Sequence, residues 1–168
     1  MEQKILTTNN LELTLTEAIS ECEHERIFVL TDETTRNVCW PVMKDFLALR
    51  DAKLITIPPT DANKNLHSLS QVWETLAAEH ATRHALLINL GGGMVTDLGG
   101  FAASTYKRGI DFINVPTTLL AMVDASVGGK TGINFYGVKN EVGVFNNAQC
   151  VIFYMPFLKT LDRQNLLS

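Results

Sequence analysis

The sequence predicts an α/β fold in which a mainly parallel sheet is covered by helices on both faces. Its 168 residues, with 46% hydrophobic and 19% charged side chains, suit a single globular domain that buries a core. Short apolar segments alternate with amphipathic segments along the chain, which is typical of strands alternating with helices. Several of these strands are apolar on both faces, as parallel strands between two layers of helices are.

The first half of the chain contains two of these strands and two helices. Residues 26–31 form a short, apolar, β-branched run, and residues 53–57 form another, which a pair of prolines ends. Between them we expect a helix that begins at Pro41, because proline is favoured in the first turn of a helix. Residues 66–77 carry apolar side chains at three- and four-residue spacings, which predicts an amphipathic helix.

Strands and helices continue to alternate in the second half. An apolar strand at 84–90 runs directly into a glycine triplet, and a helix is predicted over 94–107. Further strands are predicted at 111–115 and 150–154. The residues from 156 onward read as the start of another helix, so we expect the chain to be one domain of a longer protein.

Charge and composition argue against several classes of protein. A formal net charge of -4 gives no reason to expect nucleic acid or an anionic membrane as a partner. Three cysteines at wide spacings, without a CxxC pair, argue against a disulfide framework and a cysteine-rich zinc site, and they fit the reducing cytoplasm. The first residues lack the apolar run of a signal peptide, and the most apolar stretch, 85–103, contains an asparagine, an aspartate and five glycines. We therefore expect a cytoplasmic protein without a membrane span.

Glycine is distributed very unevenly along the chain. All eleven glycines lie between Gly91 and Gly143, and residues 1–90 contain none. Glycine allows conformations and close approaches that a Cβ atom forbids, so we expect this half to bring its backbone close to a ligand or another element. A loop-rich half with many tight turns is the alternative, and the glycine pairs and triplet make it less favourable.

The strand–glycine–helix junction at 91–97 is a candidate phosphate site. Backbone N–H groups and the helix dipole at such a junction attract an anion such as a pyrophosphate. Thr96 stands where the strict GxGxxG pattern has its last glycine, so the junction alone leaves a phosphate site and a plain turn equally open. Gly99 and Gly100 inside the helix cost about 2 kcal/mol relative to alanine, which predicts close packing of that helix. Asp97 is either a ligand residue or a surface acid that complements the dipole.

Two further strand ends carry polar side chains at the carboxyl edge of the predicted sheet, where ligands bind in open parallel sheets. Asp32 follows the first strand and suits either a ribose hydroxyl or the N-cap of a helix; its position alone favours the cap. Thr117 and Thr118 follow the strand at 111–115 with two hydroxyl groups.

The segment after these threonines places charges among glycine and apolar residues, unlike a solvated charge run. These charges are Asp124, Lys130 and Lys139. The letters GGKT suggest a P-loop, but Asp124 stands six places before Lys130, where GxxxxGK[ST] needs glycine, and a helix instead of a strand precedes it. The four histidines show no metal-binding spacing, so we expect no metal site within this chain.

Four segments of the chain, taken in order, closely resemble 3-dehydroquinate synthases: GGGMVTDLGGFAASTYKRGI, VPTTLLAMVDASVGGKTGIN, VKNEVGVF and FLKTL. The resemblance runs from about Arg26 to Leu161 and is densest from Ala85 to Phe145, which makes it specific. It implies that residues 1–168 are the Rossmann-like, NAD-binding amino-terminal domain of that family. The family's carboxyl-terminal domain is helical and binds a divalent metal, usually zinc or cobalt, through one Glu and two His. That domain would be absent from this chain.

The resemblance also implies roles for individual residues. Asp32 matches the acid that holds the adenosine ribose, and 93–97 match the turn that cradles the pyrophosphate and holds the nicotinamide-side ribose. A third matched segment, residues 59–64, lies between these two in the chain. There Lys64 is the same as in the family, Asp61 stands in place of the family's Glu with a side chain one carbon shorter, and Thr60 replaces its Gly. The residues implied at the cofactor are Asp32, Asp61, Lys64, Gly91, Gly92, Gly93, Met94, Val95, Thr96, Asp97, Thr117, Thr118, Asp124, Lys130, Lys139, Phe157, Leu158, Lys159 and Thr160. Those implied in catalysis, near the nicotinamide and the substrate, are Asp124, Lys130, Lys139 and Asn140.

The activity implied by the resemblance is conversion of the sugar phosphate 3-deoxy-D-arabino-heptulosonate 7-phosphate to 3-dehydroquinate and phosphate. This is a carbon–oxygen lyase step of the shikimate pathway of aromatic amino acid biosynthesis. It proceeds through transient NAD-dependent oxidation, phosphate elimination, re-reduction and cyclisation. We expect a homodimer, and we expect this chain alone to be inactive because the metal ligands are missing. The alternatives are a related sugar-phosphate cyclase, a metal-dependent polyol dehydrogenase and a non-catalytic nucleotide-binding module.

Overall fold

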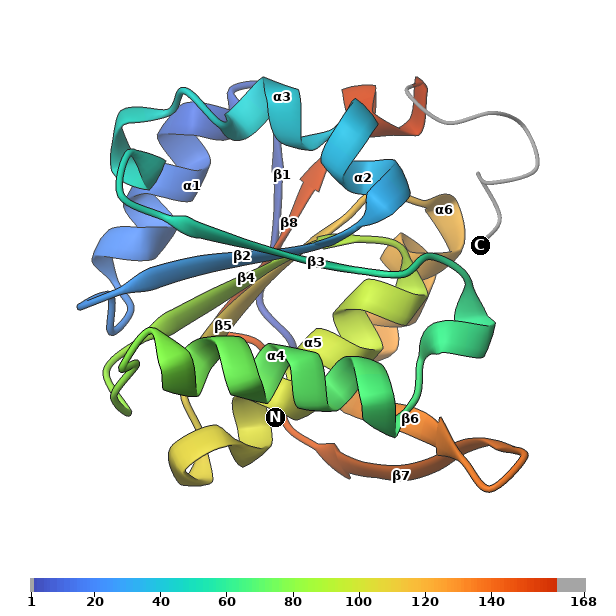
Figure 1. Cartoon of the computed structure of the whole chain (residues 1–168). Coiled ribbons are helices and arrows are strands. Elements are labelled where there is room, and N and C mark those ends of the chain that lie inside the picture. The colour runs from blue at the N-terminus through green and yellow to red at the C-terminus, as the bar shows by residue number, and fades with distance from the viewer. Residues whose placement is uncertain (1, 160–168) are drawn as a thin grey trace.

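The computed structural model describes residues 2–159 and confirms the predicted α/β fold (Figure 1). Its strands are β1 (Ile5–Thr8), β2 (Ile27–Asp32), β3 (Lys53–Ile57), β4 (Leu86–Gly91), β5 (Asp111–Pro116), β6 (Lys130–Phe135), β7 (Val138–Phe145) and β8 (Cys150–Tyr154). Six of them form one sheet in the order β1-β8-β5-β4-β2-β3, in which every neighbouring pair is parallel. The other two, β6 and β7, pair as an antiparallel hairpin.

Helices cover both faces of the sheet, as predicted. They are α1 (Leu11–Ser20), α2 (Glu33–Val38), α3 (Trp40–Met43), α4 (Leu66–Ala78), α5 (Gly93–Thr105) and α6 (Leu119–Val127). In the view of Figure 1, α4 and α5 pack below the sheet, and α1 and α3 pack above it. Successive side chains of a strand point to opposite faces of the sheet. In β2, Phe28 and Leu30 therefore belong to the core between the sheet and helices α4 and α5, while Val29 belongs to the core on the opposite face. No helix within residues 2–159 has both the length and the apolar composition that crossing a bilayer requires.

The two glycines inside α5 lie at its closest contacts, which confirms the close packing expected of that helix. A Cβ atom at Gly99 would overlap the side chain of Asn89 in β4. A Cβ atom at Gly100 would come within 2.7 Å of the Thr131 Cγ2 atom in β6. Glycine at these two places therefore lets α5 sit between the sheet and the hairpin.

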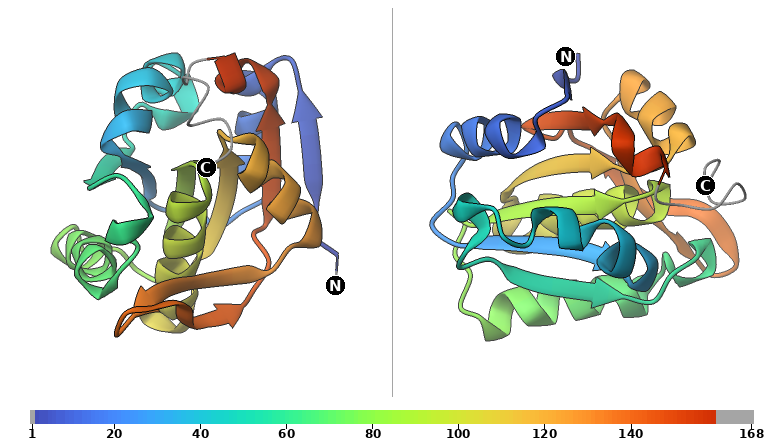
Figure 2. Two further views of the ribbon diagram at one scale, coloured as in Figure 1. Left: turned by 90° about the vertical axis from the view of Figure 1, so that its right-hand side faces the viewer. Right: turned by 90° about the horizontal axis from the view of Figure 1, so that it is seen from above.

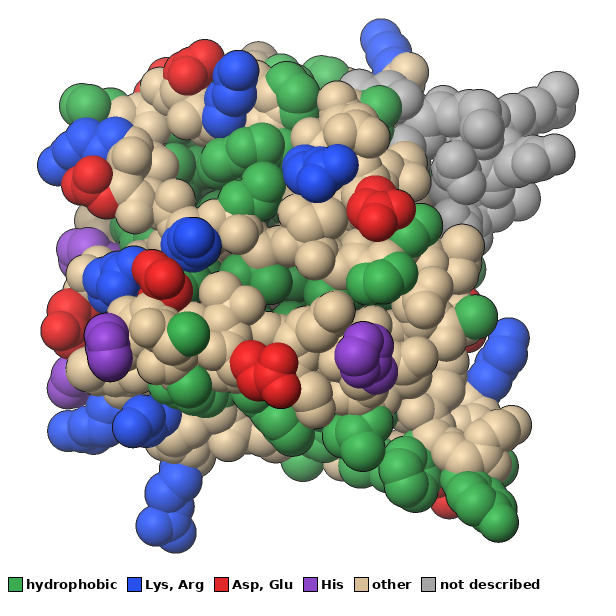
Figure 3. All heavy atoms as spheres, viewed as in Figure 1, with side chains coloured by type: hydrophobic (Ala, Val, Ile, Leu, Met, Phe, Trp, Pro, Cys, Tyr) green, Lys and Arg blue, Asp and Glu red, His purple; other side chains and the backbone are tan. Residues whose placement is uncertain are grey.

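The β6–β7 hairpin packs on α5, outside the main sheet (Figure 2). Its two-residue turn, Tyr136–Gly137, has a positive φ at both positions, as short hairpin turns require. β7 is exposed along its whole length, and the side chain of Tyr136 in the turn is 90% exposed. Apolar side chains are visible on the surface at the lower right of Figure 3, on the side of the molecule where the hairpin lies. The sequence pattern predicts no strands here, because an exposed hairpin lacks the alternation that a half-buried strand shows.

The helix predicted at Pro41 is shorter than expected, and the chain already becomes helical before it. The chain already forms α2 from Glu33, breaks at Cys39, and continues as α3, which contains Pro41 and is only 4 residues long. The earlier start follows from a capping box at the end of β2, in which Asp32 and Thr35 bond each other's backbone N–H groups. The predicted entry of a helix at Pro41 is confirmed, because Pro41 lies in the first turn of α3, but α3 ends at Met43 and does not extend to Leu49 as the apolar pattern suggested.

Candidate functional site

The chain reverses its direction across the sheet between β2 and β4. From β2 it crosses to β3 on one side, and from β4 it crosses to β5 on the other side. Consequently α2 begins after β2 and α5 begins after β4, on opposite faces of the sheet. The carboxyl ends of parallel strands at such a reversal point flank the crevice where open α/β sheets bind ligands.

The glycine turn places the amino end of α5 at this edge. Gly92 is the N-cap without a side chain, and no atom lies within 4 Å of where a Cβ atom of Gly93 would be. The first N–H groups of a helix lack acceptors within it; here the Val95 N–H already donates to the Gly92 carbonyl oxygen at 3.1 Å, so it is the N–H groups of Gly93 and Met94 that, together with the dipole, suit an anion. Thr96, which departs from the GxGxxG pattern, donates its hydroxyl to the Gly92 carbonyl oxygen at 3.3 Å. The threonine thus bonds back to its own helix and leaves the turn open.

A cavity of about 500 Å³ opens beside the amino end of α5. Several of the predicted site residues line it together: Gly93, Thr96 and Asp97 from α5, Asp124 from α6, Lys130 from β6 and Asn140 from β7. Met94 and Val95 do not line this cavity; they pack with the apolar core under α5. Six of the predicted site residues therefore meet around one space, whereas other predicted residues, among them Asp32, Thr117 and Lys139, do not line it.

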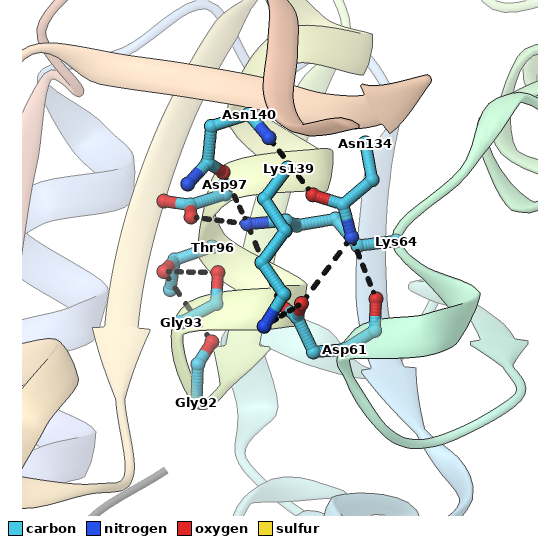
Figure 4. Close-up of polar contacts among 9 residues, drawn as sticks. All are labelled: Asp61, Lys64, Gly92, Gly93, Thr96, Asp97, Asn134, Lys139 and Asn140. Carbon is cyan, nitrogen blue, oxygen red and sulfur yellow. Dashed lines mark hydrogen bonds and ion pairs between the residues drawn. The ribbon is translucent and has the colours of Figure 1, made fainter. Parts of the chain in front are cut away.

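Lys64 is buried at the centre of the polar contacts of the site, with 4% of its side chain exposed. Its ammonium group donates to Asn140 Oδ1 at 2.6 Å and to Asp97 Oδ2 at 3.1 Å (Figure 4). Asp61 lies on a third side, with its Oδ1 at 3.5 Å from the same nitrogen, and the exposed Lys139 approaches Asp61 Oδ2 at 3.8 Å. The loop after β3, helix α5 and the hairpin thus meet at one buried cation whose charge is paired.

The pKa of Asp97 lies above the usual value for an aspartate. Burial is the main cause, because it disfavours the charged form. The charge and the hydrogen bond of Lys64 oppose this shift, whereas the carboxylates of Asp124 and Asp61 add to it. Since Lys64 occupies Oδ2, Asp97 Oδ1, which makes no hydrogen bond within residues 2–159, is free to accept from a ligand hydroxyl.

Asp32 is the N-cap of α2, as its position in the sequence favours. Its Oδ1 accepts the Thr35 N–H at 2.8 Å, and the Thr35 hydroxyl donates to the Leu90 carbonyl oxygen at 3.0 Å. The second contact ties the start of α2 to the end of β4. The cap occupies one carboxylate oxygen of Asp32, so a ribose contact through the other oxygen stays a prediction.

The two threonines after β5 differ in their hydrogen bonds. Thr118 is the N-cap of α6 and accepts the Ala121 N–H at 3.2 Å. The Thr117 N–H donates to the Gly91 carbonyl oxygen at 2.9 Å, whereas its buried hydroxyl has no hydrogen-bond partner in the described part of the chain. An unpaired buried hydroxyl at a strand end is available to a ligand or a water molecule.

Three of the predicted cofactor residues at the end of the chain, Phe157, Leu158 and Lys159, follow shortly after β8. Phe157 is fully buried and meets Tyr154 edge-on, with 5.1 Å between the ring centroids, so its side chain belongs to the core of the domain. Leu158 is half-buried and Lys159 is exposed. Thr160 lies outside the described residues.

Asn134, at the end of the GGKTGIN segment, is a site residue that the sequence patterns do not single out. Its side chain hydrogen-bonds Asp61 on one side and the backbone of Asn140 on the other. Its place at the end of a motif shared with the family is the one signal that pointed to it. Among residues 2–159, no group of three His, Cys, Asp or Glu side chains is placed to hold a metal ion.

The chain is similar to known proteins over nearly its whole length. A family model described as 3-dehydroquinate synthase N-terminal matches residues 54–168. The 3-dehydroquinate synthase of Parabacteroides distasonis is 49% identical over 167 residues, which is 99% of this chain and 47% of that protein. The chain thus spans about half the length of the curated relatives it matches.

Solved structures share the fold. The structure of 2-epi-5-epi-valiolone synthase from Streptomyces hygroscopicus subsp. jinggangensis, with NAD⁺ and Zn²⁺ bound, has a TM-score of 0.83 and 29% identity, covering 98% of this chain and 46% of that one. The structure of 2-deoxy-scyllo-inosose synthase complexed with carbaglucose-6-phosphate, NAD⁺ and Co²⁺ has a TM-score of 0.86 over 98% of this chain and 47% of that one; at 21% identity it supports the fold alone.

Proposed function

The chain belongs to the 3-dehydroquinate synthase family, and from this membership we propose that it is the NAD-binding half of an enzyme that converts 3-deoxy-D-arabino-heptulosonate 7-phosphate to 3-dehydroquinate and phosphate. The observation that carries the proposal is the buried ammonium group of Lys64, held by Asp97 and Asn140 beside the open glycine turn. A fixed, paired charge next to an anion site suits an enzyme that must orient a cofactor and a substrate together.

The residues at the crevice fit NAD. The backbone N–H groups after Gly92 and Gly93 would receive the pyrophosphate. Asp97 would accept from the nicotinamide-side ribose and Asp32 from the adenosine ribose, each through its free carboxylate oxygen. The unpaired hydroxyl of Thr117 would find a partner at the same edge. When bound, NAD supplies a hydride acceptor that oxidises a substrate hydroxyl and later returns the hydride.

Charged and amide side chains around the cavity would act on the substrate. The ammonium groups of Lys130 and Lys139 would stabilise the negative charge that develops on a polarised carbonyl and a leaving phosphate. Asp124 and Asn140 would orient substrate hydroxyls through hydrogen bonds. The described residues contain no group of three His, Cys, Asp or Glu side chains that could hold a metal, and the family resemblance implies that the ligands of zinc or cobalt lie in the carboxyl-terminal domain.

The family also suggests the setting of the enzyme. A step of aromatic amino acid biosynthesis, the shikimate pathway, takes place among small sugar phosphates in the cytoplasm. We assign the protein to that compartment, as a homodimer with a sugar phosphate as its ligand. Neither nucleic acid nor a membrane is part of the proposal, since the net charge of -4 favours neither.

The test compares the 168-residue chain with the full-length protein that contains it. With NAD and zinc, the full-length protein is expected to release phosphate from 3-deoxy-D-arabino-heptulosonate 7-phosphate and to form 3-dehydroquinate, whereas the chain alone is expected to bind NAD without turnover. A folded, metal-loaded full-length protein that releases no phosphate contradicts the proposed activity. Turnover by the chain alone contradicts the assignment of the metal site to the missing part.

A related sugar-phosphate cyclase is the second candidate. The 29% identity and TM-score of 0.83 to the valiolone synthase favour it, because the residues around the cofactor would be shared and the substrate contacts would differ. Identification of the carbocyclic product by mass spectrometry and NMR separates the two. An inosose formed from a hexose phosphate or a valiolone formed from a heptulose phosphate, with no 3-dehydroquinate formed from 3-deoxy-D-arabino-heptulosonate 7-phosphate, would select the second candidate.

A further inference from the structure

We infer that Asn134 is a positioning residue that joins the cofactor loop, residues 58–65 between β3 and α4, to the β6–β7 hairpin. Through this link it sets the places of Asp61, Lys64 and Asn140. The inference rests on the proposed NAD site, because Asp61 and Lys64 matter there as cofactor residues. Asn134 itself is not among the residues expected to touch the cofactor or the substrate.

Asn134 bonds to three residues at once, with its backbone and with both ends of its side-chain amide. Its backbone N–H donates to the Lys64 carbonyl oxygen at 2.8 Å. Its Nδ2 donates to the Asp61 carbonyl oxygen at 2.9 Å and to Asp61 Oδ2 at 3.3 Å, and its Oδ1 accepts the Asn140 N–H at 2.9 Å (Figure 4). These contacts require a donor and an acceptor on one short side chain, which an aspartate, a leucine or an alanine lacks.

Asn140 depends on this support because its backbone is unusual. The hairpin register shifts between Ile133 and Phe135, and Asn140, on the opposite strand, has a φ of 55° in the left-handed region. Asn134 fixes the peptide N–H of this irregular segment. With the backbone so held, Asn140 Oδ1 meets the Lys64 ammonium at 2.6 Å.

The other end of the same amide holds the cofactor loop. Asp61 contacts Asn134, and its carboxylate lies 3.5 Å from Lys64 Nζ and 3.8 Å from Lys139 Nζ. A displacement of the hairpin would therefore move Asn140 away from Lys64 and remove the contact of Asn134 that holds Asp61 in place. Without Asn134, part of the binding free energy would be used to order these segments, so the affinity for NAD would fall.

The first test is the affinity of the chain for NAD, measured by isothermal titration calorimetry. Asn134→Ala is expected to raise the Kd about tenfold, which corresponds to about 1.4 kcal/mol. Asn146→Ala is the matched control: this asparagine follows the same hairpin and its Nδ2 donates to Ser104 Oγ on α5 at 2.9 Å, away from the cofactor loop. The Kd of Asn146→Ala for NAD is expected to stay within about twofold of the wild-type value. Equal affinity of Asn134→Ala and wild-type protein overturns the inference.

A double-mutant cycle separates positioning from a general loss of stability. If Asn134 acts through Asp61, the variant with both Asn134→Ala and Asp61→Ala binds NAD no more weakly than the weaker single variant. If the fold-change in Kd of the double variant equals the product of the fold-changes of the two single variants, Asn134 does not act through Asp61 and the inference is overturned. Asn134→Asp keeps the acceptor for the Asn140 N–H and loses the donor to Asp61, so it is expected to weaken NAD binding as well, and it serves if the alanine variant does not fold.

Hydrogen exchange of the ligand-free chain tests the link without NAD. Amides in residues 136–141 are expected to exchange faster in Asn134→Ala than in wild-type protein and in Asn146→Ala. Unchanged exchange there overturns the inference. If wild-type protein does not bind NAD, the proposed cofactor assignment fails, and the exchange measurement still decides whether Asn134 holds the hairpin.

Discussion

At the scale of single residues, the partly buried carboxyl of Asp97 makes stability depend on pH. Burial raises its pKa above the ordinary value of 3.8, so the folded protein holds this proton more tightly than the unfolded chain does. The contribution of Asp97 to the stability of the fold is fully present below the pKa of the unfolded chain. This contribution is lost as the pH rises through the higher pKa that Asp97 has in the folded protein. The difference in thermal midpoint, wild type minus Asp97→Asn, should therefore decrease from acidic to neutral pH. A difference that increases with pH contradicts this sign.

The backbone strain at Thr60 lowers the stability of the folded chain by an amount that can be measured. This residue stands where the family resemblance places a glycine, and its backbone keeps a φ of 78° and a ψ of 152°, a conformation that favours glycine. Thr60→Gly is expected to stabilise the chain by about 1 kcal/mol, because the strain of the Cβ atom is relieved. Thr60→Ala is the control, since alanine keeps a Cβ atom and should bring no gain. Urea unfolding of the three proteins measures the difference; equal stabilities contradict the strain at this position.

At the scale of the elements, the carboxylate at the start of α2 caps the helix and is also the proposed partner of a ribose. Asp32→Ser keeps an N-cap, since serine caps helices about as well as aspartate, but removes the charge offered to a ribose. Unfolding stability is expected to change by less than about 0.5 kcal/mol, while the Kd for NAD rises about tenfold. If NAD binding is unchanged, Asp32 is only a helix cap. If stability falls instead, the cap needs the charge as well as the hydrogen bond.

The elements also show which parts of the fold the sequence predicts and which it does not. β4 and α5 follow from an apolar run that ends in glycines, because burial on both faces leaves a clear pattern. β7 is exposed along its length, so it leaves no such pattern. The same holds for the site. The glycine turn can be predicted from the sequence, because its glycines are consecutive. Asn134 cannot, because its hydrogen bonds reach residues 61 and 140, which come together only in the folded chain.

At the scale of the whole molecule, the sheet brings Asp32 after β2 and the glycine turn after β4 to the same edge, so a cofactor bound across that edge should stabilise the entire fold. With NAD at a hundredfold excess over its Kd, the stabilisation is about 2.7 kcal/mol. For a chain of this size that corresponds to an increase of roughly 5–10 °C in the midpoint of thermal unfolding. Differential scanning fluorimetry measures this shift directly.

The same measurement tests which dinucleotide the crevice accepts. A carboxylate at the adenosine ribose accepts hydrogen bonds from its hydroxyls and repels a 2′-phosphate, so NADP should raise the midpoint far less than NAD at equal concentration. In Asp32→Ser the repulsion is gone, and the two dinucleotides should shift the midpoint by more similar amounts. Equal shifts by NAD and NADP in the wild-type chain would place the adenosine ribose away from Asp32. A selectivity that disappears with the carboxylate would instead show that one charge at the end of β2 both begins a helix and selects the cofactor.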